Sequence, residues 1–484
     1  MRLLHASNLV FKEFVGSNIP KYIIISHRWS DEEVSHQDFL DGRRDFLYGR
    51  CSGYGWVKIA KACQLAKKAD IEWVWIDTCC IDKKSSAELT EAINSMFNWY
   101  QRSTECLVFL PDVEPIEGRA GLPPSADGES KWELPVGFLP EALRASVWFT
   151  RAWTLQELLA PEQCAFFNSK FEFIGTKRLL ATLISERTKI PELVLSNAHS
   201  RWGHQIRSEP VAVRMHWASS REATRVEDLA YSLLGLFGVS MPLLYGEGDR
   251  AFLRLQKELI GISDDETIFL SIDTTIPHHN PRSAIAANPL HFMNVPHYMN
   301  VPVLYRDLYV NAIPRLHYEV TNKGIRFEVQ ISRKKLSALV EREPPRIRHL
   351  PQHFEIIMPL NCYMYNIREM SDSPIAIKLR VASQSTASIT DHQSLSVLRG
   401  TTHNDFFYGS LLDKEARRTP DDNLSSYSTW VSWTTGEKAD ADIVVGEFDG
   451  SEVACQVYVE FMPEGFRQRG RLLEMLLNNP VKAA

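Results

Sequence analysis

Residues 73–83 read Trp73-Val-Trp-Ile-Asp77-Thr-Cys-Cys-Ile-Asp-Lys83, and this stretch decides the predicted fold. Its first four residues are apolar and of strand length, and acids and thiols follow at once. A short, fully apolar strand is typical of a parallel sheet that is covered on both faces. Open α/β sheets bind ligands beyond the carboxyl ends of such strands. We therefore expect the polar residues that follow Ile76 to lie at a ligand-binding edge.

The neighbouring segments extend this pattern into alternating strands and helices. Apolar runs of strand length occur at residues 21–26 and 106–110. Between the three predicted strands, apolar residues recur at helical spacing over residues 59–66, and a capping box at 85–88 opens a second helix that reaches residue 100. Strand, helix, strand, helix and strand at this spacing predict a parallel sheet with right-handed crossovers.

The rest of the chain predicts two further regions. Residues 112–140 are rich in proline, glycine and glutamate and indicate a surface insertion, and a helix is expected over 148–159. Helical patterns continue to residue 262, with a second capping box at 224–227. Beyond residue 265, short alternating segments punctuated by proline and histidine favour a mainly antiparallel β domain. The expected domains are an α/β domain at 1–190, a helical extension at 191–265 and a β-rich accessory domain at 266–484.

The composition excludes several classes of protein. With 484 residues, the chain is long enough for two or three domains. Its hydrophobic content of 44% and charged content of 24% are typical of a soluble globular protein rather than a disordered one. The formal charge of −6 argues against a surface built for a phosphate backbone, so we expect no nucleic-acid partner.

Cysteine spacing and hydropathy indicate the compartment. None of the eight cysteines forms a Cys-x-x-Cys pair, and no cluster of His, Cys, Asp and Glu has metal-ligand spacing. We therefore predict no metal and a reducing, cytoplasmic location. The first residues lack the apolar core of a secretory signal. The uncharged segment 229–246 contains two internal glycines and a proline, so we interpret it as a buried helix and a turn rather than a membrane span.

Four ordered motifs resemble the fungal heterokaryon-incompatibility (HET) domain. They are Tyr-Ile-Ile-Ile-Ser-His-Arg-Trp at 22–29, Trp-Ile-Asp to Lys at 75–83, Arg-Ala-Trp-Thr-Leu-Gln-Glu-Leu-Leu at 151–159, and the segment 225–248. His27 stands where tyrosine is common in that family, and Ala223 stands where threonine is common. The resemblance implies a role in non-self recognition and in the cell death that follows incompatible fusion. Since the chain has no Gly-x-x-x-x-Gly-Lys-Ser/Thr loop, assembly driven by ATP or GTP is disfavoured.

HET domains are in turn similar to TIR domains, which are flavodoxin-like parallel sheets that act in innate immunity and cell death. Residues 153–158, Trp-Thr-Leu-Gln-Glu-Leu, resemble the Trp-Cys-Leu-x-Glu-Leu helix of NAD-cleaving TIR domains. In those enzymes the glutamate is catalytic, and Glu157 occupies the matching position. The resemblance implies NAD as a substrate, with no resident cofactor, although whether the chain is an enzyme stays open.

The chemistry of NAD cleavage fits these residue types. A carboxylate can stabilise the oxocarbenium-like state that forms when the nicotinamide leaves, and Glu157 is the candidate. Trp153 lies one helical turn earlier and is expected to share its face. Ser26, His27 and Arg28 are expected to leave the first strand at the same edge as Asp77. These five residues are the predicted ligand-binding set: Ser26, His27, Arg28, Asp77 and Trp153.

Each candidate also has a purely structural reading. Glu157 can pair with Arg151 or a loop donor, Asp77 can cap its loop, and His27 can be satisfied by loop carbonyls. The competing hypothesis is a non-catalytic signalling module that forms homo-oligomers or binds an unidentified incompatibility partner. Burial separates the two hypotheses. A catalytic Glu157 should line an open cleft with Asp77 and Arg28, whereas a structural one should be enclosed and fully paired.

Overall fold

The computed structural model describes residues 1–16, 18–115, 140–196, 205–269, 271 and 285–293, together with the backbone of eight strands between residues 317 and 460. The backbone divides into two compact units, which are treated separately below. One comprises Met1–Glu209, Val213–Leu255 and Asn288–Leu290, and the other comprises Pro210–Ala212, Gln256–Ala287 and His291–Ala484. Most of the predicted insertion at 112–140 lies outside the described residues.

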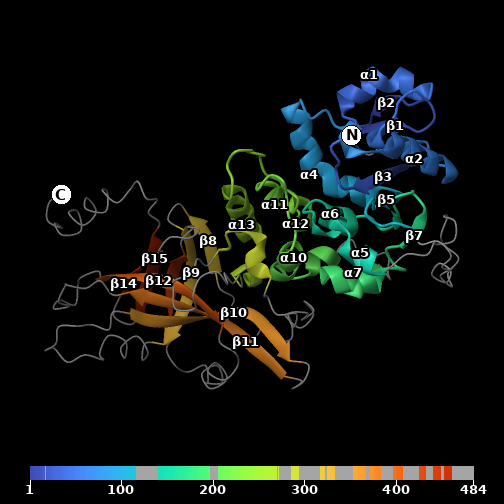
Figure 1. The fold of residues 1–484 in the computed structure, drawn as a ribbon. Helices are drawn as coiled ribbons and strands as arrows, with labels where there is room; N and C mark the ends of the chain where they lie inside the picture. The colour runs from blue at the N-terminus through green and yellow to red at the C-terminus, as the bar shows by residue number, and fades with distance from the viewer. Residues whose placement is uncertain are drawn as a thin grey trace. The chain divides into compact units, whose positions relative to one another are not determined.

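A seven-stranded mixed sheet forms the centre of the first unit (Figure 1). Its order is β2-β1-β4-β3-β5-β6-β7, with β4, β3, β5 and β6 parallel to one another and antiparallel strands at both edges. The predicted α/β class is therefore confirmed. The strands are β1 (Arg2–His5), β2 (Phe11–Glu13), β3 (Tyr22–His27), β4 (Trp73–Trp75), β5 (Glu105–Phe109), β6 (Cys164–Phe167) and β7 (Phe173–Thr176).

The order of the parallel strands reverses between β3 and β5. From β3 the chain first adds β4 on one side and then crosses to place β5 and β6 on the other. The last residues of β3 and β5, His27 and Phe109, are register partners at the point of reversal. All six residues of β3 are buried, as are the five of β5. Sheets of this type bind ligands beyond the carboxyl ends of the strands at such a reversal.

Two long helices follow the expected apolar periodicity. In α4, the Ser85 side chain accepts a hydrogen bond from the Glu88 amide, which is one half of the predicted capping box. The Glu88 carboxylate instead accepts from the Asp82 amide at 2.9 Å. The helix buries one stripe of side chains at 3.6-residue spacing, which includes Ile93, Phe97 and Tyr100. The helices around the sheet are α1 (His36–Leu47), α2 (Tyr54–Lys68), α3 (Asp77–Cys80), α4 (Ser86–Arg102), α5 (Pro140–Ala145), η1 (Val147–Thr150) and α6 (Thr154–Leu159).

Nine further helices follow the sheet in the described part of the chain. At α12, a Cβ on Gly235 would lie 2.0 Å from Cβ of Phe97, so only glycine permits this close approach to α4. The helices after β7 are α7 (Ala181–Thr188), α8 (Glu192–Ser196), α9 (Gln205–Ser208), α10 (Val211–Ala218), α11 (Asp228–Tyr231), α12 (Leu234–Phe237), α13 (Arg250–Ile262), η2 (Glu266–Phe269) and η3 (Pro289–Phe292).

The single helix predicted over residues 148–159 is wrong, because it is divided into η1 and α6. Between the two, the Ala152 amide donates to the Glu222 carbonyl at 2.8 Å, and the Glu222 amide donates to the Thr150 carbonyl. These bonds form an isolated parallel bridge and use backbone groups that a continuous helix would need. The capping box predicted at 224–227 is also wrong. The Thr224 hydroxyl accepts from Arg151, and α11 begins at Asp228 without a side-chain cap.

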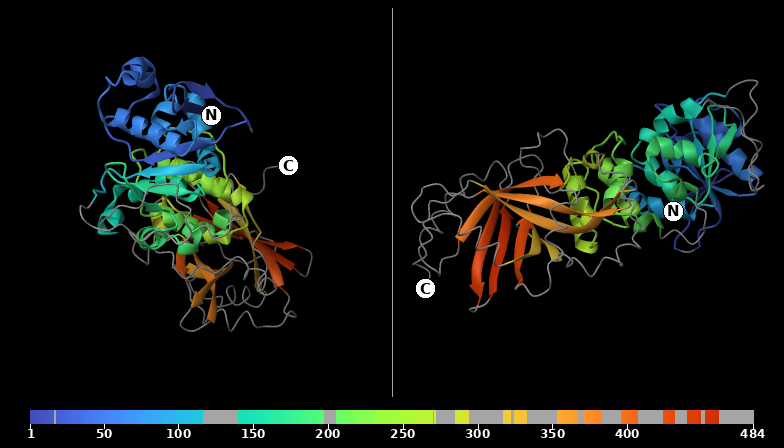
Figure 2. Two further views of the ribbon diagram at one scale, coloured as in Figure 1. Left: turned by 90° about the vertical axis from the view of Figure 1, so that its right-hand side faces the viewer. Right: turned by 90° about the horizontal axis from the view of Figure 1, so that it is seen from below.

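The second unit contains an eight-stranded sheet in the order β10-β11-β12-β14-β15-β13-β9-β8. Figure 2 shows these strands side by side, coloured from yellow to red. Every pairing is antiparallel except that of β13 with β15. The predicted domain boundaries stay a prediction. The strands are β8 (His317–Thr321), β9 (Gly324–Ser332), β10 (His353–Asn366), β11 (Ser371–Ala382), β12 (Ser396–Phe406), β13 (Leu424–Val431), β14 (Asp440–Phe448) and β15 (Glu452–Glu460).

Candidate functional site

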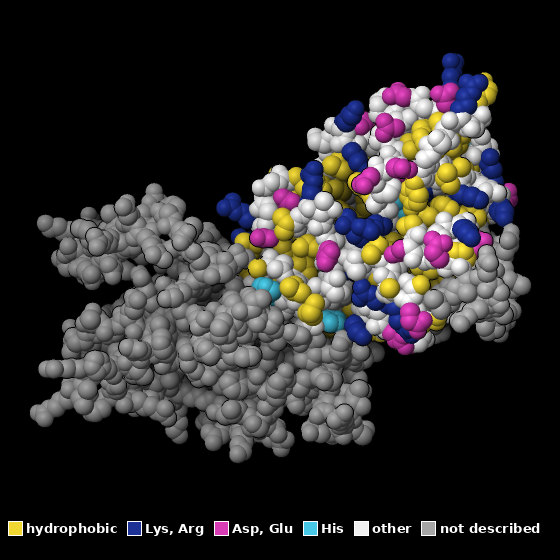
Figure 3. Space-filling view, viewed as in Figure 1, with side chains coloured by type: hydrophobic (Ala, Val, Ile, Leu, Met, Phe, Trp, Pro, Cys, Tyr) yellow, Lys and Arg dark blue, Asp and Glu magenta, His cyan; other side chains and the backbone are white. Residues whose placement is uncertain are grey.

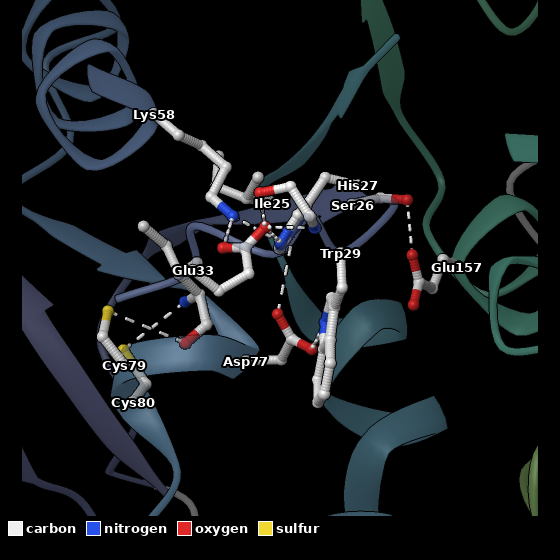
Figure 4. Close-up of polar contacts among 12 residues, drawn as sticks. Ile25, Ser26, His27, Trp29, Glu33, Lys58, Asp77, Cys79, Cys80 and Glu157 are labelled. Carbon is white, nitrogen blue, oxygen red and sulfur yellow. Dashed lines mark hydrogen bonds and ion pairs between the residues drawn. The ribbon is translucent and has the colours of Figure 1, made fainter. Parts of the chain in front are cut away.

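Ser26 and His27 end β3 and direct their side chains to opposite sides of the strand (Figure 4). This follows from the two-residue period of a strand. Ser26 is 0% exposed and His27 is 6% exposed. They are the last two residues of β3, so they lie at the carboxyl end of the strand rather than in the loop after it. The edge therefore has two sides, which we call the Ser26 side and the His27 side.

The Ser26 side holds Glu157. The Ser26 hydroxyl donates to Oε2 of Glu157 at 2.5 Å and accepts from the indole nitrogen of Trp148 at 2.8 Å. Trp148 comes from η1 and Glu157 from α6, so the interruption between these helices places both side chains against the same strand residue. Glu157 is 8% exposed and Trp148 is 0% exposed. The carboxyl group is thus enclosed and hydrogen-bonded.

Tyr100 lies on the same side. Its hydroxyl donates to the carbonyl of Ile25 at 3.0 Å, and it lowers the pKa of Glu157. The Ser26 hydroxyl thus links the indole of Trp148 to the carboxyl group of Glu157, with the proton of each hydrogen bond pointing toward Glu157.

The surroundings of Glu157 also shift its pKa. Burial raises the pKa of Glu157 to about 8, outweighing the hydrogen bond from Ser26, which lowers it. The charge of Asp77 raises the pKa further, whereas Tyr100 and the buried guanidinium of Arg221 lower it. Glu157 is therefore mostly neutral at pH 7, and a modest change in its surroundings would alter its charge.

The His27 side is ionic. Lys58, on α2, is 0% exposed and pairs with the carboxylate of Glu33. Its ammonium also lies 2.5 Å from Nε2 of His27, and Oε1 of Glu33 lies 3.5 Å from the same nitrogen. Nε2 therefore faces both the ammonium of Lys58 and the carboxylate of Glu33. Nδ1 of His27 lies 3.9 Å from Oδ1 of Asp77, beyond hydrogen-bond distance.

The start of α2 positions Glu33 beside Lys58. The amide of Tyr54 donates to the Glu32 carboxylate at 3.0 Å, and the amide of Gly55 donates to the Glu32 carbonyl at 3.2 Å. A Cβ on Gly55 would lie 2.5 Å from that carbonyl oxygen, so the loop can approach the helix only at glycine. Tyr54 lies one helical turn before Lys58, so these contacts keep the loop that carries Glu33 close to the Lys58 side chain.

The ionic side fixes the charges of its members. Burial and the charge of Lys58 lower the pKa of His27, so the imidazole is neutral at pH 7. Burial raises the pKa of Glu33, but His27 and Lys58 outweigh it and bring the pKa to about 2. The same edge thus separates two carboxyl groups, with Glu33 ionised and Glu157 protonated. Sites that use acid and base chemistry show such separated pKa values.

Asp77 lies between the two sides. It is the first residue of α3, just beyond β4, and its Oδ2 accepts from the indole nitrogen of Trp29 at 2.6 Å. Its Oδ1 is buried and has no hydrogen-bond partner within the described part of the chain. A buried carboxylate oxygen without a donor retains the capacity to bind one. Whether Asp77 binds a ligand or caps its loop stays a prediction.

The other predicted residues lie apart from this cluster. Arg28 is exposed in the loop after β3. Trp153 precedes α6 and hydrogen-bonds Asp228, whereas Glu157 on the same helix hydrogen-bonds Ser26, so the two side chains have different partners. The structure therefore brings together Ser26, His27, Asp77 and Glu157 but not Arg28 or Trp153.

Sequence reasoning missed five residues of the cluster. Lys58 had a detectable signal, because it lies one turn before Ala62 on the apolar stripe of α2, where a lysine needs a buried partner. Trp148 and Tyr100 were expected only as core residues of helices. The missed residues are Trp29, Glu33, Lys58, Tyr100 and Trp148. No group of three or more metal-ligating side chains is arranged to hold an ion in the described residues.

Figure 3 shows basic and acidic side chains interspersed on one face. Among the helices that the structure describes, none has both the length and the apolar character needed to cross a membrane.

Comparisons with known proteins match the region that carries the site. The model of the heterokaryon incompatibility protein (HET) family matches residues 22–157, which begin at β3 and end at Glu157. The chain is also 38% identical over 278 residues to the vegetative incompatibility protein HET-E-1 of Podospora anserina. That match covers 57% of this chain and 18% of the relative, so the chain spans less than a fifth of the relative's length. No solved structure matches the chain.

Residues 22–157 therefore match a HET domain, and this region includes both sides of the edge at β3.

Proposed function

We propose that this chain acts in fungal heterokaryon incompatibility. In this proposal it is a cytoplasmic protein that takes part in non-self recognition, and this recognition leads to cell death. The support is the match of residues 22–157 to the HET family, together with the similarity to a vegetative incompatibility protein. The β-rich region after residue 265 is proposed to be an accessory domain that senses the trigger or restrains the first half of the chain.

We further propose that the HET domain is TIR-like and cleaves NAD at the carboxyl edge of its parallel strands. Numbered along the chain, β3, β4, β5 and β6 stand in the order second, first, third, fourth, which agrees with a flavodoxin-like sheet. The observation that carries the proposal is the contact of Glu157 with Ser26 at the point where this order reverses. A carboxyl group with a pKa of about 8 is suited to change its charge during a reaction near neutral pH.

The reaction follows from these groups. The bond between C1′ of the ribose and the nicotinamide nitrogen breaks, and its electron pair leaves with the neutral nicotinamide. Water then adds at C1′ and releases a proton, which gives ADP-ribose. The substrate carries a positive charge on its nicotinamide ring, and such a charge lowers the pKa of a nearby acid. We propose that NAD binding ionises Glu157, whose proton passes to solvent. The carboxylate then stabilises the oxocarbenium-like state, while Ser26 and Asp77 orient the ribose.

NAD turnover by the full chain at high protein concentration tests this proposal. Glu157→Gln keeps the size of the side chain and removes the ionisable group, so turnover should fall by at least a hundredfold. Glu91→Gln on the exposed face of α4 is the matched control and should leave turnover unchanged. If both variants cleave NAD as the unmodified chain does, Glu157 is not catalytic.

The enclosure of Glu157 favours a second candidate, a non-catalytic signalling module that self-associates or binds an incompatibility partner. Glu157 is 8% exposed and hydrogen-bonded to Ser26 and Tyr100, as a structural acid would be. Loss of viability on expression distinguishes the candidates. Toxicity that survives Glu157→Gln, with no NAD turnover in any variant, supports the signalling module.

A further inference from the structure

Trp29 is a large aromatic side chain that is both exposed and fixed. It lies two residues beyond β3 and is 51% exposed. The edge of the indole is held by the 2.6 Å hydrogen bond from its nitrogen to Oδ2 of Asp77 (Figure 4). An exposed aromatic residue with a fixed orientation, at the edge where an α/β sheet binds ligands, offers a flat surface for another ring.

A cation already lies on this ring. The ammonium of Lys83 is 3.3 Å from the centroid of the Trp29 ring. A positive charge is attracted to the face of an indole by the negative charge of its π system. Lys83 itself is exposed, so its flexible side chain can move away at little cost.

The charges around Trp29 favour a cation after Lys83 has moved. Asp77 and Glu33 are acids, Lys58 is the buried base, and His27 is lowered in pKa and therefore neutral at pH 7. Without the ammonium of Lys83, the acids outnumber the base. In addition, Oδ1 of Asp77 is buried and lacks a hydrogen-bond partner among the described residues. This oxygen can accept from a polar group that the ligand carries beside its ring.

We propose that the face of the Trp29 indole binds the cationic pyridinium ring of an oxidised nicotinamide nucleotide, which replaces the ammonium of Lys83. A pyridinium ring supplies the positive charge that Lys83 now provides, and it adds flat stacking area. Its carboxamide is a donor suited to Oδ1 of Asp77. The choice of this ring rests on the proposed function, whereas the preference for a cation rests on the contacts of Trp29 alone.

Two small ligands test the assignment on the full chain without any turnover. 1-Methylnicotinamide is a pyridinium cation, nicotinamide is its neutral counterpart, and neither contains a glycosidic bond. Titration followed by calorimetry should give a dissociation constant about tenfold lower for the cation. In Trp29→Leu this preference should disappear, and in Lys83→Gln the cation should bind more tightly because its competitor is gone.

Tyr48 provides a matched control. It is 73% exposed and has the guanidinium of Arg50 5.3 Å from its ring centroid, but it follows α1 rather than the sheet edge. Tyr48→Leu should bind both ligands as the unmodified chain does. If Trp29→Leu loses stability, Trp29→Tyr keeps a ring at the position and should retain a weaker preference for the cation.

The outcomes separate this proposal from the proposed function. Equal binding of the two nicotinamides, or a preference that survives Trp29→Leu, overturns the ring site. Binding of ADP-ribose that depends equally on Trp29 assigns the ring to adenine and also overturns it. Absence of NAD turnover beside intact binding of the cation rejects only the proposed function. Turnover with an unchanged kcat/KM in Trp29→Leu rejects only the ring site.

Discussion

Ser26 and His27 are adjacent in β3, yet they contact environments of opposite character. On the Ser26 side, hydrogen bonds from neutral groups surround a carboxyl group whose pKa is raised to about 8. On the His27 side, the buried Lys58 pairs with a carboxylate whose pKa is lowered to about 2. The comparison shows that a carboxyl group's charge at this edge depends on whether a cation is buried beside it. Desolvation acts on both acids, but Lys58 forms an ion pair with Glu33, whereas the charge of Arg221 lowers the pKa of Glu157 too little to offset burial.

The largest effect is expected from removing the cation on the His27 side. Lys58→Met should leave the carboxylate of Glu33 without its partner and lower the free energy of unfolding by about 3–5 kcal/mol. Urea unfolding measures this loss. Lys67→Met, on an exposed position of the same helix, is the control and should have little effect. The double variant Lys58→Met/Glu33→Gln should recover part of the loss, and a double variant as unstable as the single one would contradict the ion-pair account.

The pH dependence of stability tests the Ser26 side. The pKa of Glu157 is about 8 in the folded chain, above its ordinary value of 4.5, so the folded state binds more protons between these values. The stabilisation that Glu157 contributes is therefore fully present at low pH. It is lost as pH rises from about 4.5 to 8, and the free energy of unfolding falls by at most about 1.4 kcal/mol per pH unit.

Glu157→Gln should remove this slope. Unfolding free energies of the variant and the unmodified chain, measured at several pH values from 5.5 to 8, should diverge as pH rises. The opposite slope is expected for Glu33 at acid pH, because its folded pKa is about 2 and its stabilisation is lost as pH falls below 4.5. Parallel curves for Glu157→Gln and the unmodified chain would show that Glu157 is already ionised at neutral pH.

A smaller effect is expected at the Ser26 hydroxyl, which contacts both Trp148 and Glu157. Ser26→Ala removes the donor to Glu157 and leaves the buried indole nitrogen of Trp148 without its acceptor. The cost should be about 1–3 kcal/mol, and the pKa of Glu157 should rise further, because the Ser26 hydrogen bond lowers it. Thermal unfolding at pH 6 measures the cost. Ser26→Thr keeps the hydroxyl and should retain the hydrogen bonds, so equal losses in the two variants would point to packing instead.

The smallest effect on stability is expected at Lys83. Its ammonium contacts the exposed ring of Trp29, and Lys83→Gln should change the free energy of unfolding by less than about 0.5 kcal/mol. The same substitution is expected to tighten binding of a pyridinium cation. A marked loss of stability in Lys83→Gln would mean that this contact belongs to the structural charge network of the His27 side.

The sequence determined the elements that depend on local periodicity. The apolar runs predicted β3, β4 and β5, and helical spacing predicted α2 and α4 between them, because these patterns reflect burial on one face or two. The helix α1 was missed although Ser35 and Asp38 form a capping box, since it buries only Phe39 and has almost no apolar stripe. The strands β1 and β2 were missed because they are short and mix polar residues into their apolar ones.

Only the tertiary structure decided how the site is assembled. The motifs supplied Ser26, His27, Asp77 and Glu157 as candidates, but Ser26 lies 122 residues from Trp148 and 131 from Glu157 along the chain. Their contact depends on the bridge of Arg151 to Glu222, which divides the helix that local propensity predicts. Charge was decided in the same way. Nothing local distinguishes Glu33 from Glu157, because the pKa of a carboxyl group depends on burial and on the partners that folding places beside it.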